Sequence, residues 1–157
     1  MQKNANWTPY IIGAGIITGL IVLLRKRSTM KTDKLSKNFE WSEFESKDGA
    51  TMPDFVKENI KKLVQNLEVI RAAGGGAMRI NSGYRSPGHN TSIGGAKNSF
   101  HMKGMAADFT IKGKTIPETI ALIENLINQG KISQGGLGTY KTFVHYDIQG
   151  KKRRWNG

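Results

Sequence analysis

Two histidines and one aspartate in the C-terminal half of the chain have side chains that could bind a metal ion. His101 lies shortly before Gly104, where the chain can turn, and Asp108 falls inside a strand-like run of apolar residues. A carboxylate in so apolar a strand needs a partner, and a cation provides one. His145 lies in a second strand-like run. Two imidazoles and one carboxylate form the ligand set of a catalytic zinc site, in which the fourth position is left for water.

Spacing alone does not separate this metal site from a pair of ordinary buried histidines, so both interpretations stay open at this point. The chain has no cysteine, which excludes thiolate ligands, disulfides and cysteine nucleophiles. The third histidine, His89, lies in a loop containing Gly and Pro, where we expect it to stabilise the loop or contact a substrate. Asp147 follows His145 by two residues, and on a strand the two side chains point to the same face.

The elements that must position these residues follow from hydrophobic spacing and turn signals. One helix is predicted to open at residues 51–54, where Thr51 and Asp54 have capping-box spacing, and to stop at the glycines 74–76. A second helix is predicted to open at residues 115–118. Short strands are predicted over residues 77–81, 105–111, 137–140 and 143–148. This order predicts an α+β fold with a small, mainly antiparallel sheet packed against helices.

The N-terminal segment has the pattern of a membrane anchor. Residues 8–24 carry no charge and are followed directly by Arg25, Lys26 and Arg27. The apolar run reaches the lower limit of a bilayer span. We therefore expect an N-terminal transmembrane helix within residues 1–27, with a cleaved signal peptide as the alternative. Residues 28–37 are then a linker, and residues 38–157 the folded domain.

The length and charge of the chain restrict its class and its partners. A chain of 157 residues fits one domain with a short appendage. Lys and Arg number 24 against 12 Asp and Glu, and the formal net charge of +12 favours nucleic acid, anionic lipid or the bacterial cell wall as partner. The chain lacks the glycine-rich loop of nucleotide-binding proteins and the Gly-x-Ser-x-Gly elbow of serine hydrolases. The basic residues 151–154 are more often a solvated or wall-binding face than a nucleic-acid patch.

Residues 99–108, Ser-Phe-His-Met-Lys-Gly-Met-Ala-Ala-Asp, resemble the Ser-x-His-x-x-Gly-x-Ala-x-Asp signature of the zinc D-Ala-D-Ala carboxypeptidases and related peptidoglycan peptidases. Further segments are similar to the same family, especially to its short single-domain members. They are residues 82–87, 94–99 and 144–147, and the pair Arg154 and Trp155. The resemblance extends from about Leu35 to Trp155 and implies the Hedgehog/DD-peptidase fold.

The resemblance also implies roles for individual residues. His101, Asp108 and His145 would bind one Zn²⁺ per chain. Arg85 would face the substrate, where a guanidinium can hold a peptide carboxylate or the developing oxyanion, and a structural salt bridge is its alternative role. Many relatives have a catalytic Glu or Asp three residues before the last histidine ligand, but here that position is Thr142, which cannot act as a base.

Asp147 is then the nearest carboxylate, and we expect it to be the general base that activates water. The alternative is that Asp147 orients an imidazole through a hydrogen bond. Ser99 is expected to cap its turn rather than to act in the site.

The sequence therefore predicts a membrane-anchored zinc peptidase that hydrolyses peptidoglycan stem peptides or cross-links, as a D-Ala-D-Ala carboxypeptidase or an endopeptidase. Its expected partners are the peptidoglycan peptide and the lipid bilayer, and nucleic acid is not expected. The expected location is the bacterial cell envelope or a phage membrane, with phage lysis as one context, although the positive charges after the apolar run favour a cytoplasmic domain. An inactive zinc-containing module that binds peptidoglycan is the alternative, because Thr142 replaces the usual base. A basic nucleic-acid-binding protein is a third hypothesis.

Overall fold

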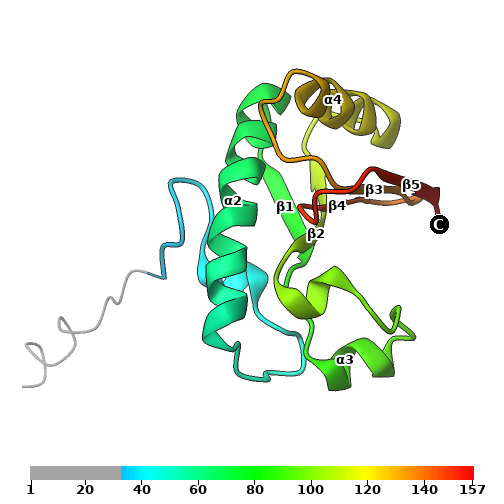
Figure 1. The fold of residues 1–157 in the computed structure, drawn as a ribbon. Coiled ribbons are helices and arrows are strands. Elements are labelled where there is room, and N and C mark those ends of the chain that lie inside the picture. Colours follow the sequence, from blue (N-terminus) through cyan, green and yellow to red (C-terminus); the bar gives the residue numbers. More distant parts are fainter. Residues whose placement is uncertain (1–32) are drawn as a thin grey trace, which may run out of the picture. The chain divides into compact units, whose positions relative to one another are not determined.

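The computed structural model describes residues 33–157, which form an α+β unit (Figure 1). Along the chain the elements are η1 (Trp41–Phe44), α2 (Asp54–Gly74), β1 (Met78–Ser82), α3 (Pro87–Ser92), η2 (Phe100–Lys103), β2 (Ala106–Ile111), α4 (Ile116–Asn128), β3 (Gly136–Thr139), β4 (Val144–Asp147) and β5 (Arg153–Asn156). The four predicted strands and the two predicted helices are all present. In Figure 1, α2 and α4 lie on one side of the sheet, and α3 with its loops lies on the other.

The sheet has five strands in the order β1-β2-β4-β3-β5. Three neighbouring pairs are antiparallel, and β3 pairs with β5 in parallel. The predicted α+β class and mainly antiparallel sheet are therefore confirmed, with one parallel pair that makes the sheet mixed. Strand β5 was not predicted, because its residues resemble a basic tail.

Helix α2 buries one face, formed by Val56, Ile60, Leu63, Val64, Leu67 and Ile70, as its hydrophobic spacing predicts. It ends where Gly75 adopts a left-handed φ of 72°. The predicted capping box of Thr51 and Asp54 is wrong, because Pro53 is the N-cap and no side chain caps the helix there. In α4 the predicted start is confirmed, since Thr115 and Glu118 form a reciprocal capping box.

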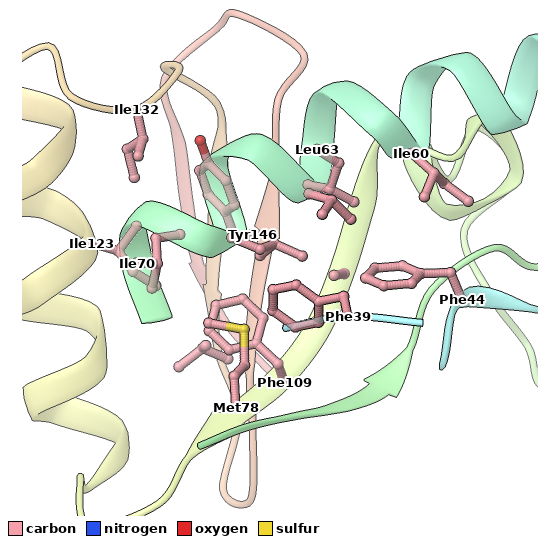
Figure 2. Close-up of a cluster of buried hydrophobic side chains, with 14 of the residues drawn as sticks. Phe39, Phe44, Ile60, Leu63, Ile70, Met78, Phe109, Ile123, Ile132 and Tyr146 are labelled. Carbon is pink, nitrogen blue, oxygen red and sulfur yellow. The ribbon is translucent and has the colours of Figure 1, made fainter. Parts of the chain in front are cut away.

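The hydrophobic core lies between the two long helices and one face of the sheet. Figure 2 shows Leu63 and Ile70 of α2 and Ile123 of α4 in the same cluster as Phe109 and Tyr146 of the sheet. All five of these side chains are fully buried. Because side chains alternate along a strand, Asp108, His145 and Asp147 are directed to the opposite face of β2 and β4. The core thus holds β2 and β4, and these strands carry two of the three candidate ligands, Asp108 and His145.

The N-terminal predictions fall mainly on residues that the structure does not describe. The predicted anchor, residues 1–27, and the first part of the predicted linker, residues 28–32, lie outside the described residues. Among the helices of residues 33–157, none has the length and apolar character needed to cross a membrane. The end of the predicted linker already contacts the folded unit, because Ser36 Oγ donates a hydrogen bond to Glu68 of α2 at 2.6 Å.

Candidate active site

The candidate site is built on one row of residues that crosses all five strands. Ser82 lies opposite Asp108 in the β1–β2 ladder, and Asp108 lies opposite His145 in the β2–β4 ladder. His145 in turn lies opposite Gly138 of β3, which pairs with Trp155 of β5. Cross-strand partners project from the same face of a sheet. Strand register alone therefore brings the two predicted ligands Asp108 and His145 together.

The third predicted ligand, His101, reaches this row from η2. Its Nε2 lies 3.2 Å from Asp108 Oδ1 and 3.2 Å from His145 Nδ1, and the last two atoms are 2.8 Å apart. Ligands of a tetrahedral Zn²⁺ at its usual bond lengths lie about 3.3 Å from one another. All three side chains are buried. The structure thus brings the three predicted ligands together with spacings close to those of a zinc site.

The outer nitrogens of both imidazoles fix which ring atoms face the centre. His101 Nδ1 lies 2.7 Å from the carbonyl oxygen of Gly83, which can only accept, so this nitrogen carries the proton and leaves a lone pair on Nε2. His145 Nε2 faces the carboxylate of Asp147 at 3.4 Å, which leaves a lone pair on Nδ1. Two lone pairs and one carboxylate oxygen therefore converge. Three acceptors at this distance need a cation between them, either a proton or a metal ion.

The charges of the centre follow from these contacts. Burial lowers the pKa of His101 below its ordinary value. Burial also opposes ionisation of Asp108 and His145. The hydrogen bonds of Asp108 with His101 and His145 prevail and hold its pKa well below its usual range, and those of His145 with Asp108 and Asp147 raise the pKa of His145. Asp108 is therefore an anion at neutral pH, as a metal ligand must be.

Arg85 faces the same centre from the turn after β1. Its Nη2 donates to Asp108 Oδ2 at 2.5 Å, and its Nε donates to Ser82 Oγ at 2.9 Å. The turn is anchored by the backbone N–H of Ser86, which donates to Ser46 Oγ at 2.9 Å. Arg85 thus forms the salt bridge that was its alternative role, and it also lines the cleft described below.

Asp147 lies behind His145 rather than beside the three converging acceptors. Its side chain is fully buried, and Oδ1 accepts hydrogen bonds from the backbone N–H groups of Gly136 and Gln149 at 2.9 and 3.2 Å. Its Oδ2 accepts from Arg153 Nη2 at 2.7 Å and faces His145 Nε2. Both oxygens of this carboxylate are thus occupied, one of them by the cleft-lining Arg153, and Asp147 itself is not among the residues that line the cleft.

A cleft of about 490 Å³ opens in front of the centre, with Arg85, His101, Asp108 and His145 in its wall. Three ring side chains form an aromatic wall on one side, namely Tyr140, Phe143 and Trp155. Tyr140 and Phe143 stack with ring centres 4.4 Å apart, and Trp155 Nε1 donates to Tyr140 Oη at 3.1 Å. Trp155 also lies 5.1 Å from the His145 ring.

Some site residues were not predicted, and others lie away from the chemistry. Phe100, Tyr140 and Arg153 line the cleft but carry no motif that spacing could reveal. Ser99 caps η2 as expected, by accepting from the backbone N–H of His101 at 3.3 Å, and it also lines the cleft. His89 lies in α3 and is not among the cleft-lining residues, nor is Thr142.

Comparison with known proteins agrees with the resemblance noted in the sequence. The probable peptidoglycan L,D-endopeptidase MepK of Haemophilus influenzae is 42% identical to this chain over 82 residues, which cover 48% of this chain and 40% of the relative. The chain thus spans less than half the length of this relative. The family model for peptidase M15 matches residues 37–147, which include Arg85, His101, Asp108 and His145. The chain therefore belongs to the peptidase M15 family.

Proposed function

We propose that this protein is a zinc-dependent peptidase that hydrolyses peptide bonds in peptidoglycan stem peptides or cross-links. The observation that carries the proposal is the convergence of His101 Nε2, His145 Nδ1 and Asp108 Oδ1 at the base of an open cleft. Membership of the peptidase M15 family supports the reaction class. The name of the Haemophilus influenzae relative supports peptidoglycan as the substrate and an endopeptidase as the type.

The donor set fits zinc better than it fits the hard cations. Two imidazole nitrogens and one carboxylate are typical ligands of catalytic zinc, whereas Ca²⁺ and Mg²⁺ prefer oxygen ligands throughout. The outer nitrogen of each ring already contacts an acceptor, the Gly83 carbonyl or the Asp147 carboxylate. Such partners orient a ligating imidazole and fix its tautomer. When bound here, zinc would polarise the scissile carbonyl and lower the pKa of a water molecule toward neutrality.

Arg85 would hold either a carboxylate of the substrate or the negative charge that develops on the carbonyl oxygen. Its side chain lines the cleft, and its contacts to Asp108 and Ser82 fix the guanidinium beside the metal ligands. A guanidinium that is fixed before the reaction stabilises developing charge without reorganising.

For Asp147 the contacts favour the orienting role over the role of general base. A base must lie within hydrogen-bond reach of the proton that it removes. Asp147 is fully buried, and its oxygens are occupied by the N–H groups of Gly136, Gln149 and Arg153. We propose that it holds His145 with Nδ1 toward the centre. Among the described residues that line the cleft, Asp108 is the only one with a carboxylate.

The test is to measure zinc content and peptidoglycan hydrolysis by the full chain, with and without chelator, using mass spectrometry to identify the fragments. We expect one zinc per chain and chelator-sensitive release of new peptide ends, whose masses name the bond. His101→Ala should lose both zinc and hydrolysis. His89→Ala is the matched control, because it removes a histidine that does not line the cleft.

Other results would contradict the proposed function and favour a different one. Zinc without hydrolysis would favour the inactive binding module, and neither zinc nor hydrolysis would mean that the three candidate ligands have another role. Binding to duplex DNA that falls steeply with salt and ignores chelator would favour the nucleic-acid hypothesis.

The membrane anchor over residues 1–27 stays part of the proposal, supported by the uncharged run and the basic cluster that follows it. Retention of the full chain in carbonate-washed membranes is the expected result. Release into the soluble fraction would contradict the anchor and leave the peptidase proposal unaffected.

A further inference from the structure

We propose that Arg153 forms a second carboxylate-binding position in the cleft, separate from Arg85, which selects substrates with a free carboxylate beside the aromatic wall. The inference rests on the proposed peptidase function and adds a substrate requirement to it. Arg153 opens strand β5 and lines the cleft together with Phe100 and Trp155.

Three contacts fix the guanidinium of Arg153. Its Cζ lies 5.0 Å from the ring centre of Phe100 and 5.5 Å from the ring of Trp155. Its Nη2 donates to Asp147 Oδ2 at 2.7 Å. Arginine is favoured for such stacking because its guanidinium is planar and delocalised. A long side chain that would otherwise be mobile at the end of a strand is thus held in one orientation before any ligand arrives.

The same contacts leave part of the guanidinium free. An arginine side chain carries five N–H donors. In the described part of the chain, the bond from Nη2 to Asp147 is the only hydrogen bond that this guanidinium donates. The side chain is 47% exposed, whereas that of Asp147 is 0% exposed. Arg153 therefore neutralises a buried carboxylate with one donor and presents the remaining donors to solvent and to the cleft.

The charge of the cleft favours an anionic ligand. Its lining contains two guanidinium groups, those of Arg85 and Arg153, and one carboxylate, that of Asp108. Asp108 Oδ2 is paired with Arg85, and Asp108 Oδ1 faces the two histidines. A free carboxylate in this part of the cleft would thus find its donors at Arg153, whose fork matches carboxylate geometry. Stem peptides of peptidoglycan carry several carboxylates, so the position would distinguish among them.

The experiment compares synthetic stem tetrapeptides whose carboxylates are free or converted to carboxamides one at a time. The zinc-loaded full chain is assayed as wild type, Arg153→Gln, Arg153→Lys and Lys152→Gln. Arg153→Gln removes both the positive charge and the fork, whereas Arg153→Lys keeps the charge alone. Lys152→Gln removes an equal charge from an exposed neighbour that does not line the cleft.

We expect that replacing one particular carboxylate of the peptide by a carboxamide lowers the kcat/KM of the wild type about 10- to 100-fold, the range for a charged hydrogen bond. Arg153→Gln should cleave the acid and that carboxamide at equal rates, while Lys152→Gln keeps the wild-type preference. Arg153→Lys should keep only part of it, because lysine lacks the fork. If Arg153→Gln still prefers the acid over the carboxamide, another residue such as Arg85 recognises this carboxylate, and the proposal is wrong.

The proposal is overturned if Arg153→Gln lowers the rates for acid and carboxamide equally, or if no carboxamide affects the wild type. Equal losses would mean that Arg153 is only the counter-ion of Asp147. Calorimetric binding of the same peptide pairs separates this inference from the proposed function. If no peptide is cleaved, an acid preference in binding that Arg153→Gln abolishes still supports the position, and equal binding of both forms refutes it.

Discussion

The carboxylate of Asp147 faces Nε2 of His145 at 3.4 Å, while Nδ1 of the same ring faces Asp108 and His101. The imidazole therefore stands between Asp147 and the converging acceptors. The expectation that Asp147 and His145 share a strand face is confirmed, but a shared face does not decide which ring nitrogen the carboxylate meets. This geometry supports the proposed role of Asp147 as a residue that positions the imidazole.

Asp147→Asn should weaken zinc binding about 10- to 100-fold, which is typical when the hydrogen-bond partner of a ligating histidine is lost. It should also lower the thermal midpoint, because the amide NH₂ would face hydrogen-bond donors in either orientation: the N–H groups of Gly136 and Gln149, or the side chain of Arg153. At saturating zinc, turnover should return to within about tenfold of the wild type. Competition with a fluorescent zinc chelator, followed by assays at saturating zinc, measures both quantities.

Unchanged zinc affinity together with complete loss of turnover at saturating zinc would contradict this prediction. Such a result would restore Asp147 as the general base.

Zinc should stabilise the folded protein, because the three ligands come from η2, β2 and β4 and meet only in the native state. At free zinc a hundredfold above Kd, the thermal midpoint should rise on the order of 10 °C. His101→Ala should remove the rise, and His89→Ala should retain it. Differential scanning fluorimetry across a zinc titration measures the shift, and an equal rise in His101→Ala would place the zinc elsewhere.

Glycine at position 138 leaves room for the aromatic wall. A Cβ at Gly138 would lie 2.6 Å from Trp155 Cε2, so Gly138→Ala must displace the indole. The displaced ring would lose its contacts with His145 and Tyr140, and we expect at least a tenfold fall in kcat/KM and a lower thermal midpoint. Gly88→Ala is the matched control, because its nearest neighbour would be 3.7 Å away. Equal activity of the two variants would show that the position of Trp155 is irrelevant to catalysis.

The sequence predicts the elements with strong local patterns and misses those made by distant pairing. The buried stripe from Val56 to Ile70 and the cap at Thr115 are local, and the structure has both. Strand β5 exists because Trp155 lies across Gly138 in a parallel pair, and nothing in the run of basic residues before Trp155 encodes that partner. The capping box at Thr51 fails because Pro53 itself occupies the cap position.

The candidate site likewise contains residues that the sequence predicts and residues that only the fold reveals. Motif resemblance identified His101, Asp108, His145 and Arg85, which the fold then brings to one cleft. Phe100, Tyr140 and Arg153 come from three separate segments and have no shared spacing, so only the folded chain reveals their proximity. The orientation of the His145 ring depends on side-chain rotation about a strand, which sequence spacing does not determine.

The loop that presents Arg85 should loosen in acid. Asp48 Oδ2 accepts a hydrogen bond from Ser86 Oγ at 2.5 Å, and hydrogen bonds from Ser86 and Ser46 lower the pKa of Asp48 to about 2. Because the pKa is lower in the folded than in the unfolded chain, Asp48 stabilises the fold above about pH 4, and this contribution disappears as the pH falls toward 2. Asp48→Asn should therefore be less stable than wild type at pH 7 and lose less stability between pH 4 and 2.

Thermal midpoints of the zinc-free full chain from pH 7 to pH 2 measure this difference. Zinc-free protein is needed because protons compete with zinc for the histidines. Glu45→Gln is the control, because Glu45 lies three residues before Asp48 and its carboxylate makes no side-chain hydrogen bond among the described residues. The thermal midpoint of this variant should change with pH in parallel with that of the wild type. If the thermal midpoint of Asp48→Asn also changes in parallel with that of the wild type, the hydrogen bond between Asp48 and Ser86 does not stabilise the fold. If the curves converge toward pH 2 as expected, this part of the acid sensitivity of the fold originates in one carboxylate outside the cleft.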